Sequence, residues 1–201
     1  SKNDKEKDYY YILDEIGLLS EVQMNSYEFH IWGSNASNKN KPNMMVFDLD
    51  PDKSLSLDKL RLGVKYLKEI LDNLNLKSFL KTSGGKGYHI CIPFKNNLTW
   101  KKFYKISEDI ANIIENTHSE LFTTNNRKEK RKNKIFIDYL RNQKSATFVA
   151  PYSIRLRKNA PVSMPIAWNE LDKIKPNEIT IYKAIKRLKK KDPWKDFFTS
   201  N

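Results

Sequence analysis

The segment Phe47-Asp48-Leu49-Asp50 places two carboxylates in a short apolar run that begins at Met44. Apolar and acidic residues alternate here, a pattern that predicts a strand over residues 44–50. Residues i and i+2 of a strand point to the same face, roughly 6.5–7 Å apart, so Asp48 and Asp50 face one space. Two carboxylates on a buried face raise each other's pKa unless a cation neutralises them, and Mg²⁺ or Mn²⁺ prefers such oxygen ligands. A strand end at which both side chains reach solvent is the alternative.

A third carboxylate ends a second apolar segment, Ile135-Phe136-Ile137-Asp138, within a strand expected over residues 134–140. Three carboxylates from two strands can hold two metal ions about 3.5–4 Å apart, the arrangement used in phosphoryl transfer. We therefore interpret Asp48, Asp50 and Asp138 as catalytic residues and as ligands of a two-metal Mg²⁺ or Mn²⁺ site.

A glycine-rich segment, Thr82-Ser83-Gly84-Gly85-Lys86-Gly87-Tyr88-His89, joins two predicted strands over residues 78–83 and 88–94. Its backbone N–H groups can bind an anion and Lys86 adds positive charge. The spacing is not that of a P-loop, and a strand follows the turn in place of a helix. On the second strand, His89 shares a face with Cys91, where it can donate to a phosphate or serve as a structural histidine.

Further basic side chains are candidates for phosphate contacts. Arg155 and Arg157 alternate with Ile154 and Leu156, and arginines on one strand face suit bidentate phosphate binding. An exposed edge strand explains this spacing equally well. His30 lies among large apolar residues, which favours a buried, hydrogen-bonded role for it.

Composition bounds the class of protein. The chain has 201 residues, with 37 Lys and Arg against 24 Asp and Glu, so its formal net charge is +13. This excess raises the expectation of a polyanionic partner. The single cysteine, Cys91, excludes a disulfide framework and suits a reducing cytosol. No apolar run reaches the roughly 18–20 residues of a membrane span, and the charged residues 1–10 are unlike a signal peptide.

The positive charge is clustered. Residues 127–134 carry six positive charges and one negative, and residues 181–196 carry seven and two. Either run is compatible with a solvated surface or with nucleic-acid binding. From the first run we select Lys128, Lys130, Arg131 and Lys132 as candidate nucleic-acid contacts.

Periodicity predicts the remaining elements. A helix is expected over about residues 58–74 with Ser56 as its N-cap, and a second follows Thr99, with its inner face formed by Phe103, Ile106, Ile110 and Ile113. A strand is expected near residues 146–154 and a basic helix over about 178–191. Mixed helices and strands around a central hairpin predict an α+β fold, a mixed or antiparallel sheet flanked by helices. We expect residues 1–201 to form one domain.

The ordered motifs closely resemble the polymerase domain of bacterial DNA ligase D, a member of the archaeo-eukaryotic primase superfamily. The motifs that carry the resemblance are Glu28-Phe29-His30-Ile31-Trp32-Gly33, Val46-Phe47-Asp48-Leu49-Asp50-Pro51, Lys81-Thr82-Ser83-Gly84-Gly85-Lys86-Gly87-Tyr88-His89, Ile135-Phe136-Ile137-Asp138-Tyr139 and Ala150-Pro151-Tyr152-Ser153-Ile154-Arg155. They extend over nearly the whole chain, from about Tyr10 to Asp196.

The resemblance implies a primase-polymerase-like catalytic core that adds ribo- or deoxyribonucleotides to DNA 3′ ends during non-homologous end joining. It implies metal binding by the three aspartates and nucleotide binding by His30, Ser83, Gly84, Lys86, His89 and Arg155. It also places Arg131 near a basic residue at the rim of the family's active site. The implied partners are DNA with 3′ ends or gaps, nucleoside triphosphates, a DNA ligase and a Ku-type end-binding protein, in a cytoplasmic, nucleoid-associated setting without a membrane.

One departure from the family concerns the N-terminus. The family carries a longer segment ahead of the Phe-His-x-Trp motif, with basic residues that recognise a 5′-phosphate. This chain lacks most of that portion, so it is interpreted as a reduced relative or as a fragment. Two other functions remain open: a nucleic-acid-binding module without catalysis, and a haloacid-dehalogenase-like phosphatase with Asp48 as nucleophile, although Asp52 does not fit the phosphatase pattern.

Overall fold

A six-stranded sheet and a separate two-stranded ribbon organise the computed structural model, which describes residues 11–95 and 97–200. The helices are α1 (Glu15–Gln23), α2 (Leu57–Asn73), α3 (Trp100–Thr117) and α4 (Ile181–Arg187). The strands are β1 (His30–Trp32), β2 (Met44–Pro51), β3 (Phe79–Thr82), β4 (Tyr88–Pro93), β5 (Phe122–Thr123), β6 (Ile135–Asp138), β7 (Thr147–Val149) and β8 (Pro165–Ile166). Short 3₁₀ helices are η1 (Ala36–Asn38), η2 (Lys128–Lys130), η3 (Trp168–Glu170) and η4 (Phe197–Thr199).

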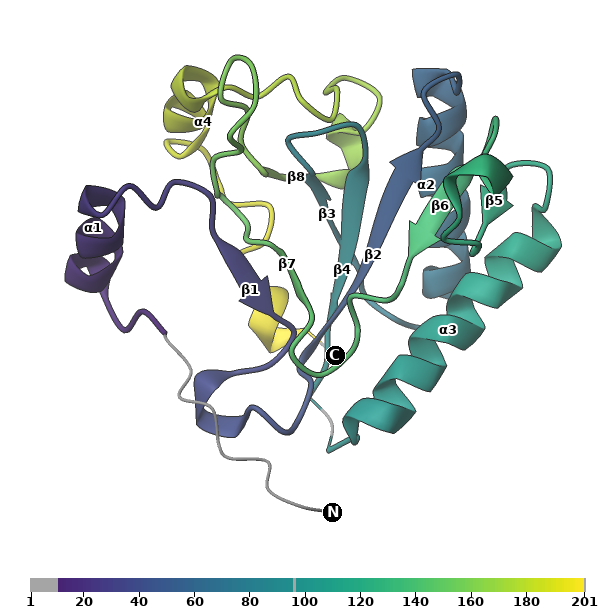
Figure 1. Ribbon diagram of the computed structural model, residues 1–201, viewed down its shortest axis with the longest axis horizontal. Helices are drawn as coiled ribbons and strands as arrows, with labels where there is room; N and C mark the ends of the chain where they lie inside the picture. Colours follow the sequence, from purple (N-terminus) through teal and green to yellow (C-terminus); the bar gives the residue numbers. More distant parts are fainter. Residues whose placement is uncertain (1–10, 96, 201) are drawn as a thin grey trace.

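The large sheet has the strand order β5-β6-β2-β4-β3-β8. Its pairs are antiparallel except β5 with β6, which are parallel. The ribbon pairs β1 with β7. Figure 1 shows this ribbon on one side of the sheet, with α2 and α3 on the other. The predicted α+β class, with its mixed sheet, central hairpin and flanking helices, is confirmed.

One face of the sheet packs against α2 and α3. Alternate residues of β2 and β4, among them Phe47, Leu49 and Ile90, join buried residues of both helices in one cluster. The predicted helix cap is present, because the Ser56 hydroxyl accepts a hydrogen bond from the Lys59 N–H group at 3.3 Å. Helical spacing then places Leu60, Val64, Leu67 and Leu71 on the buried side of α2.

The opposite face carries a smaller apolar cluster at one end and polar side chains at the other. The cluster contains Met44, Val46, Phe79, Cys91, Phe148, Trp194 and Phe197, all buried. The indole N–H of Trp194 donates to the Leu80 carbonyl at 2.9 Å, which attaches the C-terminal segment to β3. Beyond this cluster, the same face is occupied by Asp48 and His89, so the cluster borders the candidate site.

The structure corrects several sequence predictions. On α3 the buried face includes Ile114, whereas Ile113 is 45% exposed, because Ile114 follows Phe103 by about three full helical turns and so lies on the same side. The strand and the helix predicted over 146–154 and 178–191 are shorter, β7 and α4 respectively. Arg155 and Arg157 lie on a loop and not on a strand, since pairing beyond Ile154 is limited to one bridge with Val162.

The N-terminal helix α1 has no buried residue, and its apolar side chains Ile16 and Leu19 are exposed. It stands apart from the sheet in Figure 1. No helix within residues 11–95 and 97–200 has the length and apolar character needed to cross a membrane. The single-domain prediction for 1–201 stays a prediction, and residues 1–10, 96 and 201, including Tyr10 of the motif range, lie outside the described part.

Gly87, at the start of the second hairpin strand, is required by a close backbone approach. A Cβ atom at this position would overlap the carbonyl oxygen of Leu49 on β2. We therefore expect Gly87→Ala to lower the free energy of unfolding by roughly 1–3 kcal/mol, the usual cost of overpacking. Gly17→Ala on α1 is the control, because its nearest neighbouring atoms would lie at 3.3 and 3.5 Å. Equal stability of the two variants in chemical denaturation would contradict this approach of β4 to β2.

Candidate active site

Four polar residues form one row across four strands. Strand register places Lys81 of β3 opposite His89 of β4, His89 opposite Asp48 of β2, and Asp48 opposite Asp138 of β6. Directly opposed residues of antiparallel strands have Cβ atoms about 4.5–5.5 Å apart. The register therefore brings together an ammonium group, an imidazole and two carboxylates that lie far apart in sequence.

Asp48 and His89 form a close pair at the centre of this row. Nε2 of His89 lies 3.3 Å from Oδ2 of Asp48. Burial raises the pKa of Asp48, but the charges of His89, Lys81 and Arg141 and the His89 hydrogen bond outweigh it, so the pKa is lowered. Burial dominates for His89 and lowers its pKa. A neutral His89 that donates from Nε2 to an ionised Asp48 agrees with the lowered pKa of each residue. Nδ1 of His89 is then buried without a hydrogen-bond partner among the described residues.

Asp138 lies opposite Asp48 on β6 and Asp50 lies two residues further along β2, and both have raised pKa values. For Asp138 burial is the main cause and the Asp48 charge adds to it, although Arg141 opposes the shift. Nε of Arg141 donates to Oδ2 of Asp138 at 2.9 Å. For Asp50, burial and the charge of Asp48 again raise the pKa, while Lys86 and Arg131 lower it. The expected mutual rise is thus present at Asp50 and Asp138, whereas the pKa of Asp48 is lowered by its basic neighbours.

The glycine-rich turn is organised by Ser83. Its hydroxyl oxygen accepts hydrogen bonds from the N–H groups of Gly85 and Gly87, at 3.0 and 3.2 Å. Gly84 has a φ of +65°, the left-handed region that glycine adopts without strain. Nη1 of Arg155 donates to the Ser83 carbonyl at 2.7 Å. The turn is thus attached to Arg155, and the Ser83 O–H group is still available to donate.

These elements surround a cavity of about 380 Å³. Its lining includes seven predicted residues: His30, Asp48, Asp50, Ser83, Lys86, His89 and Arg155. It also includes Gly85, Gly87, Arg141, Arg157 and the β7 residues Thr147, Phe148 and Val149. Of the remaining predicted site residues, Gly84 belongs to the turn beside the lining. Asp138 borders the cavity through its partner Arg141.

His30 differs from the expectation drawn from its apolar neighbours. Its side chain is 41% exposed, and Nε2 lies 3.0 Å from Oε1 of Glu28, which also pairs with Nε of Arg155 at 2.9 Å. Within the described residues β1 pairs with β7 in a two-stranded ribbon, and the His30 side chain lines the cavity. The predicted buried role is wrong, whereas the pocket position that the family resemblance implies agrees with the structure.

The basic run contributes one side chain to the site. The Arg131 guanidinium lies 3.6 Å from the centre of the Phe136 ring, and its Nη1 is 3.6 Å from Oδ2 of Asp50. Lys128, Lys130 and Lys132 are outside the cavity lining, on or next to η2. Their role in nucleic-acid binding stays a prediction.

The oxygen atoms of Asp48, Asp50 and Asp138 are ligands of the kind that a divalent metal ion prefers, although each carboxylate is paired with a histidine or arginine side chain. Within the described residues no three His, Cys, Asp or Glu side chains form a cluster with metal-ligand spacing. The donor set of Asp48, Asp50 and Asp138 nevertheless fits Mg²⁺ or Mn²⁺. A cation among them would lower the pKa values of Asp50 and Asp138, which burial and the charge of Asp48 raise.

Sequence reasoning missed three functional or supporting residues. The first is Arg141, three positions after Asp138. The second is Asn142, whose side-chain amide accepts a hydrogen bond from the Val46 N–H group and donates one to the Val46 carbonyl of β2, both at 2.8 Å. Lys81 is fully buried on β3. The signal for Lys81 was a lysine inside an apolar strand, since lysine is almost never fully buried; nothing in the local pattern singled out Arg141 or Asn142.

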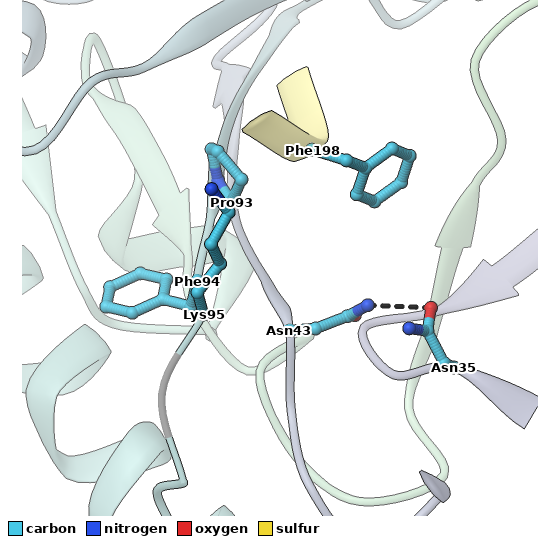
Figure 2. A pocket seen from close by; sticks show the side chains of 6 residues that line it. All are labelled: Asn35, Asn43, Pro93, Phe94, Lys95 and Phe198. Atoms are coloured by element: carbon cyan, nitrogen blue, oxygen red, sulfur yellow. Dashed lines mark hydrogen bonds between the residues drawn. The ribbon is translucent and has the colours of Figure 1, made fainter. Parts of the chain in front are cut away.

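A second cavity, of about 490 Å³, opens where β2 begins and β4 ends. Figure 2 shows its lining residues, with Asn43 donating to Asn35 at 2.7 Å and Phe198 above them. Lys95 is its only titratable lining residue among those described. The described lining of this second cavity contains no carboxylate, histidine or nucleophile. The cavity beside Asp48 is therefore the better candidate for catalysis.

Comparison with known proteins agrees with this choice. The family model for the LigD primase-polymerase domain matches residues 1–194, and the chain belongs to this family. It is 36% identical over 184 residues to the multifunctional non-homologous end joining protein LigD of Pseudomonas aeruginosa, covering 90% of this chain and 22% of the relative. The bifunctional LigD of Bacillus subtilis is 32% identical over 177 residues, covering 85% and 28%. The chain thus spans about a quarter of the curated relatives that it matches.

A solved structure also matches: the polymerase domain of Mycobacterium tuberculosis Ligase D in complex with DNA. The TM-score is 0.81 with 26% identity, and the match covers 91% of this chain and 67% of that one. This structural match agrees with membership of the LigD primase-polymerase domain family.

Glu28 connects His30 with Arg155 and makes the site sensitive to acid. Burial raises the pKa of Glu28, but His30, the Leu156 N–H group and Arg155 outweigh it and lower the pKa from 4.5 to about 2. A depressed folded-state pKa stabilises the fold above the unfolded value, and this contribution is lost as the pH falls from about 5 toward 2.

We expect Glu28→Gln to lower the free energy of unfolding at pH 7 by on the order of 2 kcal/mol. The difference from the unmodified protein should shrink steadily between about pH 5 and 2 in denaturation experiments. Asp58→Asn, at a carboxylate that is 94% exposed, controls for the loss of one negative charge. A pH-independent effect of Glu28→Gln would contradict the proposed pairing.

Proposed function

We propose that this chain adds ribo- or deoxyribonucleotides to DNA 3′ ends in double-strand-break repair by non-homologous end joining. The observation that supports it best is the convergence of Asp48, Asp50 and Asp138 from two paired strands beside a cavity with a glycine-rich turn. Basic side chains line the same cavity, so a nucleoside triphosphate and acidic side chains that hold cations can meet there.

In this mechanism Asp48, Asp50 and Asp138 would hold Mg²⁺ or Mn²⁺, which in two-metal sites activates the attacking oxygen and stabilises the leaving one. His89 keeps Asp48 oriented through the 3.3 Å contact. Arg141 and Arg131 pair with Asp138 and Asp50 and offset part of their charge.

The chain's own donors would bind the triphosphate. Lys86 and Arg155 face the cavity and can offset the charge that develops on the phosphates, while His89 lines the same cavity as the neutral partner of Asp48. The Arg157 guanidinium adds further donors, and in the turn the Lys86 N–H can do so, because the other turn N–H groups already donate within the protein. Glu28 and the Ser83 carbonyl orient Arg155 from two sides, so its guanidinium is positioned before substrate arrives.

DNA would lie on the basic surface next to this cavity. The neighbouring structure is of a polymerase domain in complex with DNA, and the +13 charge of this chain suits binding through phosphates. Lys128, Lys130, Arg131 and Lys132 are the proposed contacts to DNA with 3′ ends or gaps. A DNA ligase and a Ku-type end-binding protein would be partners, in a cytoplasmic, nucleoid-associated setting.

Of the two alternatives, only the inactive binding module still has support from an observation. The arginine partners of Asp50 and Asp138 would suit such a module, since they neutralise the carboxylates without metal. Membership of the polymerase family removes the basis for the phosphatase, which rested on the Asp-x-Asp pattern alone.

Primer extension tests the proposal. With labelled DNA, each type of nucleoside triphosphate and Mg²⁺ or Mn²⁺, we expect Asp48→Asn to lower the rate of addition about 10²-fold or more, because a charged ligand is lost. DNA affinity, measured by fluorescence anisotropy, should be unchanged. Asp52→Asn, outside the cavity on the same segment, is the matched control and should keep full activity.

Full activity of Asp48→Asn with either metal would contradict the metal assignment. DNA binding by the unmodified protein without any nucleotide addition would favour the inactive module. Release of inorganic phosphate without pyrophosphate would contradict nucleotidyl transfer altogether.

A further inference from the structure

Lys81 is a buried ammonium group that the proposed mechanism does not use. Its side chain is 0% exposed on β3, and its Nζ donates to Oγ of Ser163 at 2.6 Å. No carboxylate of residues 11–95 and 97–200 lies within 4.0 Å of it in an ion pair. Burial lowers its pKa to about 8, although the thiol of Cys91 and the charge of Asp48 oppose the shift.

Stability alone does not explain a lysine at this position. A buried charge without a close counter-ion is costly, and an apolar side chain of similar length would fill the same space at lower cost. The neighbouring residues on this face, Phe79 and Cys91, already belong to an apolar cluster. A buried charge that costs stability and stands next to a residue of a candidate catalytic pocket is typical of a functional group.

The position of Lys81 in the polar row gives it an electrostatic role. It stands opposite His89, which contacts Asp48, and its charge helps to keep the pKa of Asp48 low. Arg141, by contrast, is 47% exposed and can move away when a cation or a triphosphate enters. Lys81 is held within the sheet, so its charge stays in place throughout the reaction cycle.

Lys81 also reaches the segment that carries Arg155. Ser163 accepts from Lys81 and donates its own O–H to the Thr82 carbonyl at 3.1 Å. The backbone of Ser163 exchanges hydrogen bonds with residues 152 and 153, at 2.7 and 2.8 Å. Two residues further on, Arg155 donates to the Ser83 carbonyl in the glycine-rich turn.

From this arrangement we propose that Lys81 is a positioning residue of the nucleotidyl-transfer site. Its buried ammonium balances the carboxylate row from inside the sheet and, through Ser163, holds Arg155 in line with the glycine-rich turn. The inference rests on the proposed function, because it assigns Lys81 to that same site.

The test compares Lys81→Met, Ser163→Ala and Lys65→Met by primer extension, nucleotide binding and thermal unfolding. We expect Lys81→Met to lower kcat at least about 10-fold per folded molecule, with unchanged DNA affinity and an unfolding midpoint no lower than that of the unmodified protein. Ser163→Ala keeps the Lys81 charge but removes the hydrogen bond that connects Lys81 with the Arg155 segment. The KM for the nucleotide should therefore rise, while kcat changes less than in Lys81→Met. Lys65→Met, at a half-exposed lysine paired with Asp172, is the control.

Lys81→Met with full activity per folded molecule would overturn the proposal, whatever its stability. So would a loss of activity that only follows the fraction of unfolded protein. If Lys81→Met does not fold, Lys81→Arg decides: it keeps the charge, so we expect partial activity, and an inactive but folded Lys81→Arg overturns the electrostatic role.

Failure of the proposed function is a different result. In that case the unmodified protein itself adds no nucleotide. The affinity for the triphosphate, measured for the unmodified protein and for Lys81→Met, then tests the role of Lys81 independently of catalysis. Weaker binding by Lys81→Met would support its positioning role, and equal binding would overturn it.

Discussion

The pairing of β2 with β4 and β6 at one register is the constraint on which the site depends. It places Asp48 opposite both His89 and Asp138. Side chains alternate between the faces of a sheet, so a shift of one residue would turn Asp48 toward α2 and α3. Such a shift would also bring Phe47 and Leu49 out of the main core, and burial of apolar residues therefore holds the carboxylates in place.

Two local contacts strengthen this register. Asn142 binds both backbone groups of Val46 by its side-chain amide, and the absence of a Cβ at Gly87 lets the hairpin approach Leu49. Neither residue takes part in the proposed chemistry. Both lie within the segments that deliver acidic or phosphate-binding groups, so small backbone changes there alter the distances within the polar row.

The negative charges of the site are each compensated by a neighbouring side chain. Each carboxylate has a basic or imidazole neighbour: His89 beside Asp48, Arg131 beside Asp50 and Arg141 beside Asp138. Arg141, at 47% exposed, can move, while the buried Lys81 cannot. Under the proposed function, this pairing would keep the charges of the pocket compensated before cations and a polyphosphate bind.

Much of this fold was predictable because local patterns agree with the tertiary structure. Alternation on residues 44–50, the Ser56 cap and the helical spacing of Leu60 to Leu71 led to the correct elements and to correct faces for Asp48 and His89. Prediction failed where the burial of a side chain depended on which other elements pack against it. The packed side of α3 includes Ile114 and not Ile113, and the His30 side chain is 41% exposed beside the cavity.

By itself, the sequence determined the strands, the order of the motifs and the residue types that a phosphate and metal chemistry requires, because these follow from short-range alternation and composition. Only the tertiary structure decided which partners they have. Arg131 meets Asp50 and Lys81 meets Ser163 across about 80 intervening residues. Contacts at that separation depend on how the whole sheet closes, and no local pattern encodes them.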